Sequence, residues 1–174
     1  SLRILGPLRP AKTYDDVNDG SLVAQVELGA ARVLFTGDAE AESEAELVEH
    51  YGDGLRSDIL MLGHHGSRSS TQPKFLQSVE PALAIASCGH HNRFGFVHSE
   101  VQSRLQNYRL LRTDRDGAVT LSTDGTRWRV QRGLDNAVEY VRAGARGRRF
   151  EGPSPQGLAV GLARSGSRPG GCLE

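Results

Sequence analysis

Short apolar runs alternate with polar connections along the first 133 residues of the chain. Apolar and polar positions alternate over 23–28, which predicts a half-buried strand, and a second strand over 31–35 would turn back on it at Gly29. Two continuous apolar runs, at 59–62 and 83–86, are typical of buried strands in an α/β sheet. Further strands are predicted over 110–113, 119–122 and 127–130.

Helical patterns separate these strands. A stretch rich in Ala, Glu and Leu predicts a helix over 39–51 that begins at Asp38 or Ala39. A short helix is predicted over 73–79, and another over 99–108 with Ser99 as its N-cap. Two pairs have the turn chemistry that hairpins prefer: Asp116-Gly117 and Asp124-Gly125.

The composition changes near residue 133, which divides the chain into 1–133 and 134–174. A helix over 137–142 with Asp135 as its cap is predicted first, and the chain then becomes rich in Arg, Gly, Pro and Ser. Such a composition buries too little surface to offset its ordering entropy, so we expect a disordered tail. Four of its arginines either contact phosphates or, more simply, lie in solvent: Arg142, Arg146, Arg148 and Arg149.

Length and composition exclude several classes of protein. A chain of 174 residues is one ordinary domain, and its low mean hydropathy predicts a soluble protein. The 21 basic and 21 acidic residues cancel, so no net charge attracts nucleic acid or a membrane. No apolar run reaches the roughly 18 residues of a membrane span, and the first residues do not resemble a signal peptide. Cys88 and Cys172 are too few for a disulfide framework or a Cys-type zinc finger.

Polar side chains follow two of the predicted strands at the edge where α/β sheets bind ligands. Asp38 ends the motif Thr36-Gly37-Asp38, where its carboxylate either binds a metal or caps the next helix, and spacing alone favours capping. His64 and His65 lie between glycines after the strand at 59–62. Adjacent histidines point in different directions, so one can bind a metal while the other supports it or acts as a general acid. A functional and a structural role are evenly balanced here.

A third group follows the strand at 83–86 and contains His90, His91 and His98. Together with Asp38 these histidines form a set suited to Zn, Mn or Fe. Beside the His64–His65 pair, Ser67, Arg68 and Ser69 supply hydroxyls and a guanidinium, which is either a phosphate cradle or an ordinary polar loop.

Five motifs, in this order, resemble the metallo-β-lactamase-fold domain at the C-terminus of ComEC/Rec2 competence proteins. They are NDGSLV at 18–23, LFTGDAE at 34–40, LGHHGS at 62–67, NRFG at 92–95 and RTDRDG at 112–117. The resemblance covers about residues 2–128. It implies an α/β fold of the metallo-β-lactamase type, an αββα sandwich, of which residues 1–133 would be the C-terminal half. It also implies one or two divalent metal ions, Zn or Mn, at the edge of the sheets.

The resemblance further implies roles for particular residues. Asp38 would bridge the metals, and His64 and His65 would bind metal or transfer protons, with Asp38 and His65 as catalytic residues. The implied activity is hydrolysis of DNA phosphodiesters during DNA uptake, by attack of a metal-bound hydroxide. In the family this domain adjoins a membrane channel on the outer face of the inner membrane, whereas this chain alone would be soluble.

Two departures from the family pattern bear on activity. The His-x-His-x-Asp-His motif, which supplies most ligands of the first metal, has no counterpart in residues 1–37. The family's Asn-x-Tyr-Gly-His-Pro is Asn92-Arg93-Phe94-Gly95-Phe96-Val97 here, so Phe96 replaces a ligand that His98, His90 or His91 would have to supply. We therefore expect weak metal binding and little hydrolysis without the missing N-terminal half as a partner. A non-catalytic homologue and a small-molecule hydrolase of the same superfamily are the alternatives.

Overall fold

Six strands form one mixed sheet in which the strands follow each other in chain order. A computed structural model describes residues 1–144 and 150–151. The first three strands are antiparallel to one another, and the last four, beginning with the third, are parallel. The strands are β1 (Leu2–Gly6), β2 (Val23–Leu28), β3 (Ala31–Phe35), β4 (Ile59–Met61), β5 (Leu83–Ala86) and β6 (Arg109–Arg112).

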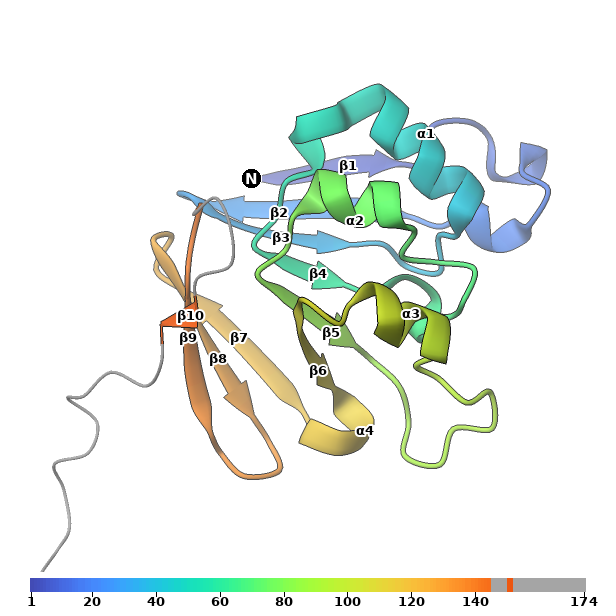
Figure 1. The fold of residues 1–174 in the computed structure, drawn as a ribbon. Helices are drawn as coiled ribbons and strands as arrows, with labels where there is room; N and C mark the ends of the chain where they lie inside the picture. The colour runs from blue at the N-terminus through green and yellow to red at the C-terminus, as the bar shows by residue number, and fades with distance from the viewer. Residues whose placement is uncertain (145–149, 152–174) are drawn as a thin grey trace, which may run out of the picture.

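A layer of helices and a second sheet cover the two faces of this sheet (Figure 1). The helices are α1 (Ala41–Tyr51), α2 (Pro73–Val79) and α3 (Ser99–Arg104), and a single turn, α4 (Thr113–Asp116), follows β6. The second sheet contains β7 (Val119–Thr123), β8 (Arg127–Arg132), β9 (Val138–Arg142) and β10 (Phe150–Glu151). Short 3-10 turns occupy Ala11–Thr13, Val17–Gly20, Gly52–Leu55 and Gly63–Gly66. Within the described residues no helix is long and apolar enough to cross a membrane.

Two hydrophobic cores lie on opposite faces of the six-stranded sheet. Leu34 and Leu60 pack against the helices, where they meet Leu47 of α1. Their neighbours Val33 and Ile59 point to the second sheet. Because side chains alternate along a strand, burial on both faces requires a continuous apolar run, which explains the sequence patterns of β3, β4 and β5.

The second sheet leaves part of the face that it covers open to solvent. Five large apolar side chains of β1, β2 and β3 lie on this uncovered part, which we call the open face: Leu2, Ile4, Val26, Leu28 and Phe35. Strand register places them beside the buried core, since Val26 pairs with Val33. Leu2, Ile4 and Leu28 are each more than half exposed. Contiguous apolar surface of this kind usually marks an interaction site.

The strands predicted from the sequence are confirmed, and so is the mixed α/β class. The helix predicted over 137–142 is wrong, because these residues form β9. Val141 is buried there against Trp128 in the second core, and its β-branched side chain favours a strand. Asp135 accepts a hydrogen bond from the N–H of Ala137 in a turn that precedes the strand.

Several element boundaries also differ from the sequence predictions. Strand β1 was not predicted, α1 begins at Ala41, and α3 ends at Arg104 with His98 in the N-cap position. The pair Asp124-Gly125 forms the expected hairpin, but Asp116-Gly117 does not, because β6 and β7 belong to different sheets. The expected disordered tail lies mostly outside the described residues, as do Arg146, Arg148, Arg149 and Cys172.

Candidate functional site

The loops that follow the parallel strands begin from one edge of the sheet. Strand register aligns the last residues of β3, β4 and β5, because Phe35 pairs with Met61, and Met61 with Ile85. Asp38, His65 and Ser87 follow these strand ends directly and therefore meet at the carboxyl edge. Asp38 and His65, which follow separate strands, therefore lie at one edge of the sheet.

The turn that carries both histidines has an unusual backbone. His64 and His65 have φ angles of 44° and 57°, in the left-handed region that side-chain-bearing residues rarely adopt. Glycines on both sides make this turn possible. A Cβ on Gly63 would lie 2.6 Å from the carbonyl oxygen of Ala39, and one on Gly66 would lie 2.7 Å from a methyl group of Val97. The turn therefore requires Gly63 and Gly66.

Asp38 and His65 form the central pair of the site. The Nδ1 of His65 lies 2.7 Å from the carbonyl oxygen of Ser87, which can only accept a hydrogen bond, so Nδ1 carries the proton. In the neutral ring, Nε2 then has a free lone pair. This atom lies 3.8 Å from Oδ1 of Asp38, too far for a direct hydrogen bond, and both side chains are about half exposed. A lone pair and a carboxylate thus face each other at an open edge.

Asp38 does not cap helix α1. The buried carboxylate of Asp19 does so instead, since its Oδ1 accepts hydrogen bonds from the N–H groups of Glu40 (2.8 Å) and Ser43 (2.9 Å). The N–H of Asp38 donates to the hydroxyl of Ser21 at 3.2 Å. The capping role that spacing favoured is therefore wrong, and the Asp38 carboxylate remains directed to the site.

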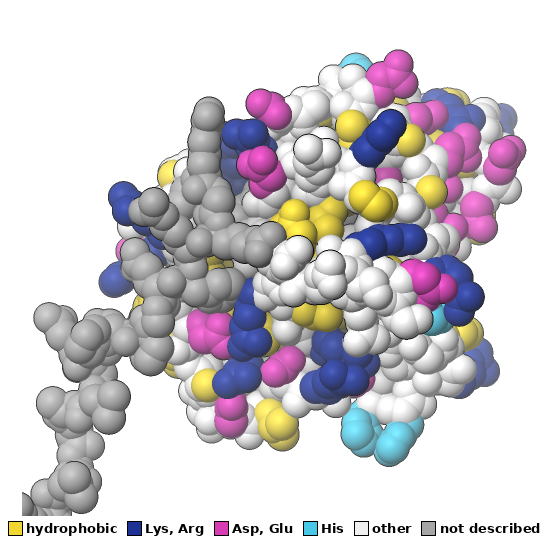
Figure 2. Space-filling model, in the orientation of Figure 1, with side chains coloured by type: hydrophobic (Ala, Val, Ile, Leu, Met, Phe, Trp, Pro, Cys, Tyr) yellow, Lys and Arg dark blue, Asp and Glu magenta, His cyan; other side chains and the backbone are white. Residues whose placement is uncertain are grey.

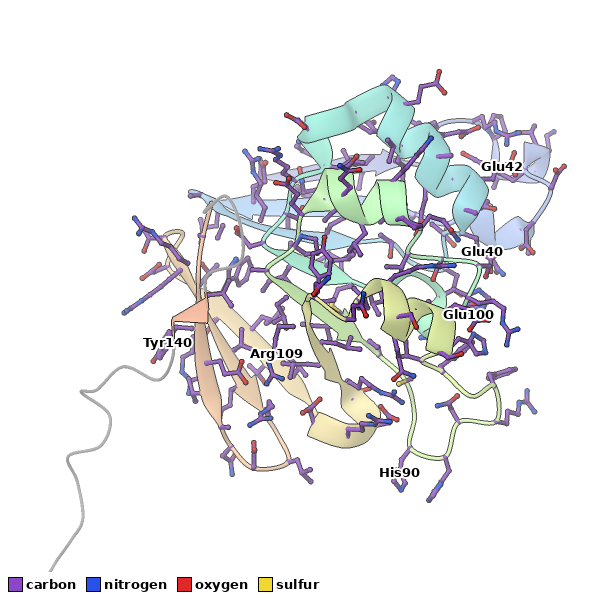
Figure 3. The ribbon with its side chains drawn as sticks, in the orientation of Figure 1. Glu40, Glu42, His90, Glu100, Arg109 and Tyr140 are labelled. Atoms are coloured by element: carbon purple, nitrogen blue, oxygen red, sulfur yellow. The ribbon has the colours of Figure 1, made fainter. Side chains whose placement is uncertain are left out.

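His64 belongs to a second polar group next to this pair. Its Nδ1 lies 2.6 Å from Oε1 of Glu40, which also accepts a hydrogen bond from the hydroxyl of Ser69 at 2.6 Å. Glu40 lies in the loop between β3 and α1 (Figure 3). Sequence analysis did not single it out, although it stands two residues after Asp38. The hydroxyl of Ser67 lies 2.8 Å from that of Ser69, so both proposed phosphate-binding serines belong to this carboxylate-centred group.

The remaining histidines are placed differently. His98 has both ring nitrogens engaged with backbone, since Nδ1 accepts from the N–H of Arg68 and Nε2 donates to the carbonyl of Phe94, both at 3.0 Å. It therefore organises two loops. His90 and His91 have ring centroids 4.0 Å apart in the loop between β5 and α3, where Figure 3 shows His90 at the outer end. The structure thus groups His64 and His65 with Asp38, and separates His90 and His91 from them.

Arg68 points away from the central pair. Its side chain is 64% exposed and one of its terminal nitrogens lies 3.6 Å from a carboxylate oxygen of Glu100. The backbone, by contrast, is fixed by the hydrogen bond to His98. The Arg68 guanidinium is therefore free to contact a ligand beyond the carboxyl edge of the sheet without a change in the fold.

Comparison with known proteins relates the chain to a part of much longer ones. It is 43% identical over 116 residues to Competence protein ComA of Neisseria gonorrhoeae, 39% over 104 residues to ComE operon protein 3 of Bacillus subtilis, and 41% over 107 residues to Recombination protein 2 of Haemophilus influenzae. These similarities support a ComEC/Rec2-type competence protein. The matches cover 64%, 59% and 62% of this chain, but only 17%, 13% and 13% of the competence-type relatives. No family model matches the chain.

The site fits a divalent metal only in part. Imidazole and carboxylate are suitable ligands for Zn or Mn, and the tautomer of His65 leaves Nε2 able to bind. The carbonyl of Ser87 would fix the ring orientation, as an outer partner of a metal-binding histidine usually does. Within residues 1–144 and 150–151, however, no three His, Cys, Asp or Glu side chains gather closely enough to hold a metal ion. Asp38 and His65 would supply two ligands to a metal ion, fewer than the three protein ligands of a catalytic zinc site.

Proposed function

We propose that this chain is the part of a DNA-uptake protein that supplies Asp38 and His65 to a metal-dependent phosphodiesterase site. The substrate would be DNA, and the remaining metal ligands would come from a region of the same protein outside these 174 residues. The observation that carries this proposal is the His65 lone pair facing the Asp38 carboxylate at the carboxyl edge of the sheet.

The open face supports the idea that another segment completes the site. It continues the surface that the second sheet covers, so a further layer of apolar side chains can extend that interface. Phe35 lies on the open face and Asp38 follows it three residues later. A segment that packs there is close enough to provide the missing ligands. With its cover, the fold would become the metallo-β-lactamase-like αββα sandwich that the sequence motifs imply.

Each group of the site has a part in such a reaction. Asp38 and His65 would hold a divalent ion, which lowers the pKa of bound water and stabilises negative charge on phosphoryl oxygens. Ser87 orients the His65 ring through its carbonyl. Glu40 orients the His64 ring from the other side of the turn. The pre-set turn keeps both rings at the sheet edge before a ligand arrives.

Metal binding by the isolated chain tests this proposal. We expect weak binding of Zn or Mn, and a loss of affinity of about tenfold or more in Asp38→Ala and in His65→Ala, because each removes one of two ligands. Isothermal titration calorimetry and elemental analysis of the dialysed protein measure the change. Hydrolysis of DNA by this chain alone should remain low until the rest of the parent protein is present.

His91→Ala is the matched control, since His91 is an exposed histidine outside the site. Its metal affinity should equal that of the unaltered chain. If Asp38→Ala binds metal as well as the unaltered chain does, the pair is not a metal site and the proposal fails. Circular dichroism of each variant shows whether the fold is intact.

A non-catalytic role is the second candidate. Two observations favour it: the described residues bring together no third ligand, and Phe96 stands where the family motif has histidine. In that case the chain would bind DNA or a protein segment without hydrolysis. This role would be supported if the full-length parent protein, with its open face unaltered, shows no nuclease activity in the presence of Mn.

A further inference from the structure

The loop between β5 and α3 presents an exposed aromatic ring. Phe94 is 59% exposed and belongs to neither hydrophobic core. Its ring stacks on that of Phe96, with centroids 5.5 Å apart and an angle of 22° between the planes. Figure 1 shows the loop extending beyond the sheet, and Figure 2 shows histidine side chains at the same lower edge of the molecule. The exposed side of this ring pair is a flat apolar surface at the edge of the molecule.

A chain of rings leads from this surface to the central pair. The Phe96 ring lies 5.9 Å from the ring of His65 and 5.7 Å from that of His64. It also meets His98 edge-on at 5.2 Å. Phe94 thus lies two ring contacts away from His65, at the edge where Asp38 is located.

Hydrogen bonds hold these rings in place. Asn92 donates to the carbonyl of Phe96 and accepts from its N–H, at 2.9 and 2.7 Å. Arg112 donates to the same carbonyl at 3.2 Å while it forms a two-pronged ion pair with Asp114. That ion pair lowers the pKa of the Asp114 carboxyl. The aromatic surface is therefore anchored to β6 and does not depend on a ligand for its position.

The groups around Phe94 are positively charged. The guanidinium of Arg93 lies 4.8 Å from the Phe94 ring centroid, and the exposed Arg68 side chain lies at the neighbouring loop. The acidic group facing them is Glu100, which lies 3.6 Å from Arg68, and Arg93 has no ion pair among the described residues. An aromatic face with adjacent arginines matches a base and its phosphate.

We propose that Phe94 is a stacking platform for an unpaired base of single-stranded DNA, with the adjacent phosphate bound by Arg93. A base in a duplex already has both faces stacked, so only an unpaired base can use the exposed ring. Stacking of a base on an aromatic ring is stronger than an exposed cation–π contact, so the base displaces the guanidinium, which turns to the phosphate. This proposal rests on the proposed function and adds strand preference to it.

Binding of short labelled oligonucleotides tests the platform. Fluorescence anisotropy is measured with an oligothymidine in EDTA, so that neither hydrolysis nor a metal ion contributes. Phe94→Ala should weaken binding about 5- to 100-fold, and Phe94→Trp should keep or improve it, since base stacking tolerates any flat ring. Arg93→Gln should weaken binding and reduce the salt slope, in log affinity against log salt, by about 0.7.

Two controls separate stacking from general stickiness and charge. Val17→Ala removes an apolar side chain that is more exposed than Phe94, at 81%, and should leave binding unchanged. An abasic oligomer of the same length, which offers phosphates without bases, should bind the unaltered chain no better than oligothymidine binds Phe94→Ala. A duplex of the same length should bind the unaltered chain and Phe94→Ala with equal affinity.

The proposal is overturned if the unaltered chain does not bind oligothymidine, if Phe94→Ala binds as tightly, or if the abasic oligomer binds equally well. The outcome is independent of the metal test, because no metal is present. Loss of metal binding in Asp38→Ala with no effect of Phe94→Ala would leave the proposed function standing without this platform. The reverse result would leave a single-strand-binding surface beside a site that binds no metal.

Discussion

Asp58→Ala should lower the free energy of unfolding by about 3–5 kcal/mol, because it leaves three hydrogen-bond donors without a partner, among them the buried Nε1 of Trp128. Oδ2 of Asp58 accepts hydrogen bonds from the N–H of Arg32 at 2.8 Å and from Nε1 of Trp128 at 3.0 Å. Its Oδ1 accepts from the N–H of Gly144 at 2.8 Å. One buried carboxylate therefore joins the two sheets at the edge opposite the candidate site.

Urea unfolding measures this change. Trp128 is the single tryptophan of the chain and is buried, so its fluorescence reports the contact directly, and circular dichroism shows whether both probes unfold together. Asp53→Ala, in which an 87% exposed aspartate is removed, should change stability by less than about 0.5 kcal/mol. The double variant Trp128→Phe/Asp58→Ala should lower the free energy of unfolding by less than the sum of the two single variants, because both remove the same hydrogen bond. Additive losses would show that Asp58 and Trp128 act independently.

Glu44→Ala is the second variant with a large expected effect, about 2–5 kcal/mol. The Glu44 side chain is buried on α1, and its two oxygens accept hydrogen bonds from the N–H groups of Thr71 (2.5 Å) and Gln72 (2.7 Å). Thr71 has a φ of 57°, so the carboxyl stabilises a turn that the backbone alone disfavours. Without it, the entry to α2 loses both partners.

The same residue makes stability depend on pH. Burial raises the pKa of the Glu44 carboxyl from 4.5 to about 8, although the two N–H donors and Arg104 act in the opposite direction. Between these pH values the unfolded chain releases a proton that the folded protein retains. Stability from this group is therefore fully present below pH 4.5 and falls as the pH rises to about 8, by up to about 1.4 kcal/mol per pH unit.

Glu44→Gln removes the titration and keeps one of the two acceptors, because its amide nitrogen can only donate. It cannot ionise, so its free energy of unfolding should lack the decline between pH 5 and 8 that the unaltered chain shows. Glu49→Ala changes an exposed residue of the same helix and should leave both the stability and its pH dependence as they are. Parallel curves for the unaltered chain and Glu44→Gln over this range would contradict the raised pKa.

Sequence pattern predicted most of the sheet, because the buried strands are defined by local apolar runs. Periodicity did not predict β1, whose Leu2 and Ile4 face solvent on the open face, or β9, which becomes a strand only through Trp128 and the second core. Both depend on contacts between residues far apart in the chain. The local sequence at 137–142 favours a helix, and tertiary packing makes this segment a strand.

The sequence predicted the location of the candidate site better than it predicted which residues form the site. Strand ends located Asp38 and His65, since parallel strands share one carboxyl edge. Spacing favoured the nearest acid, Asp38, as the cap of α1, whereas the structure uses Asp19 from a 3-10 turn 21 residues before Glu40. Likewise, both ring nitrogens of His98 bind backbone, which spacing cannot reveal.

The left-handed turn at His64 and His65 has a consequence for recognition. A left-handed conformation typically costs about 1–3 kcal/mol for each such residue. The folded protein holds both histidines in it before a ligand binds, between two glycines that leave no room for a Cβ. A ligand that arrives at the edge therefore loses little affinity to the ordering of either ring. Replacing either histidine with glycine would relieve the backbone strain and raise the free energy of unfolding. The turn would then be less rigid when a ligand binds.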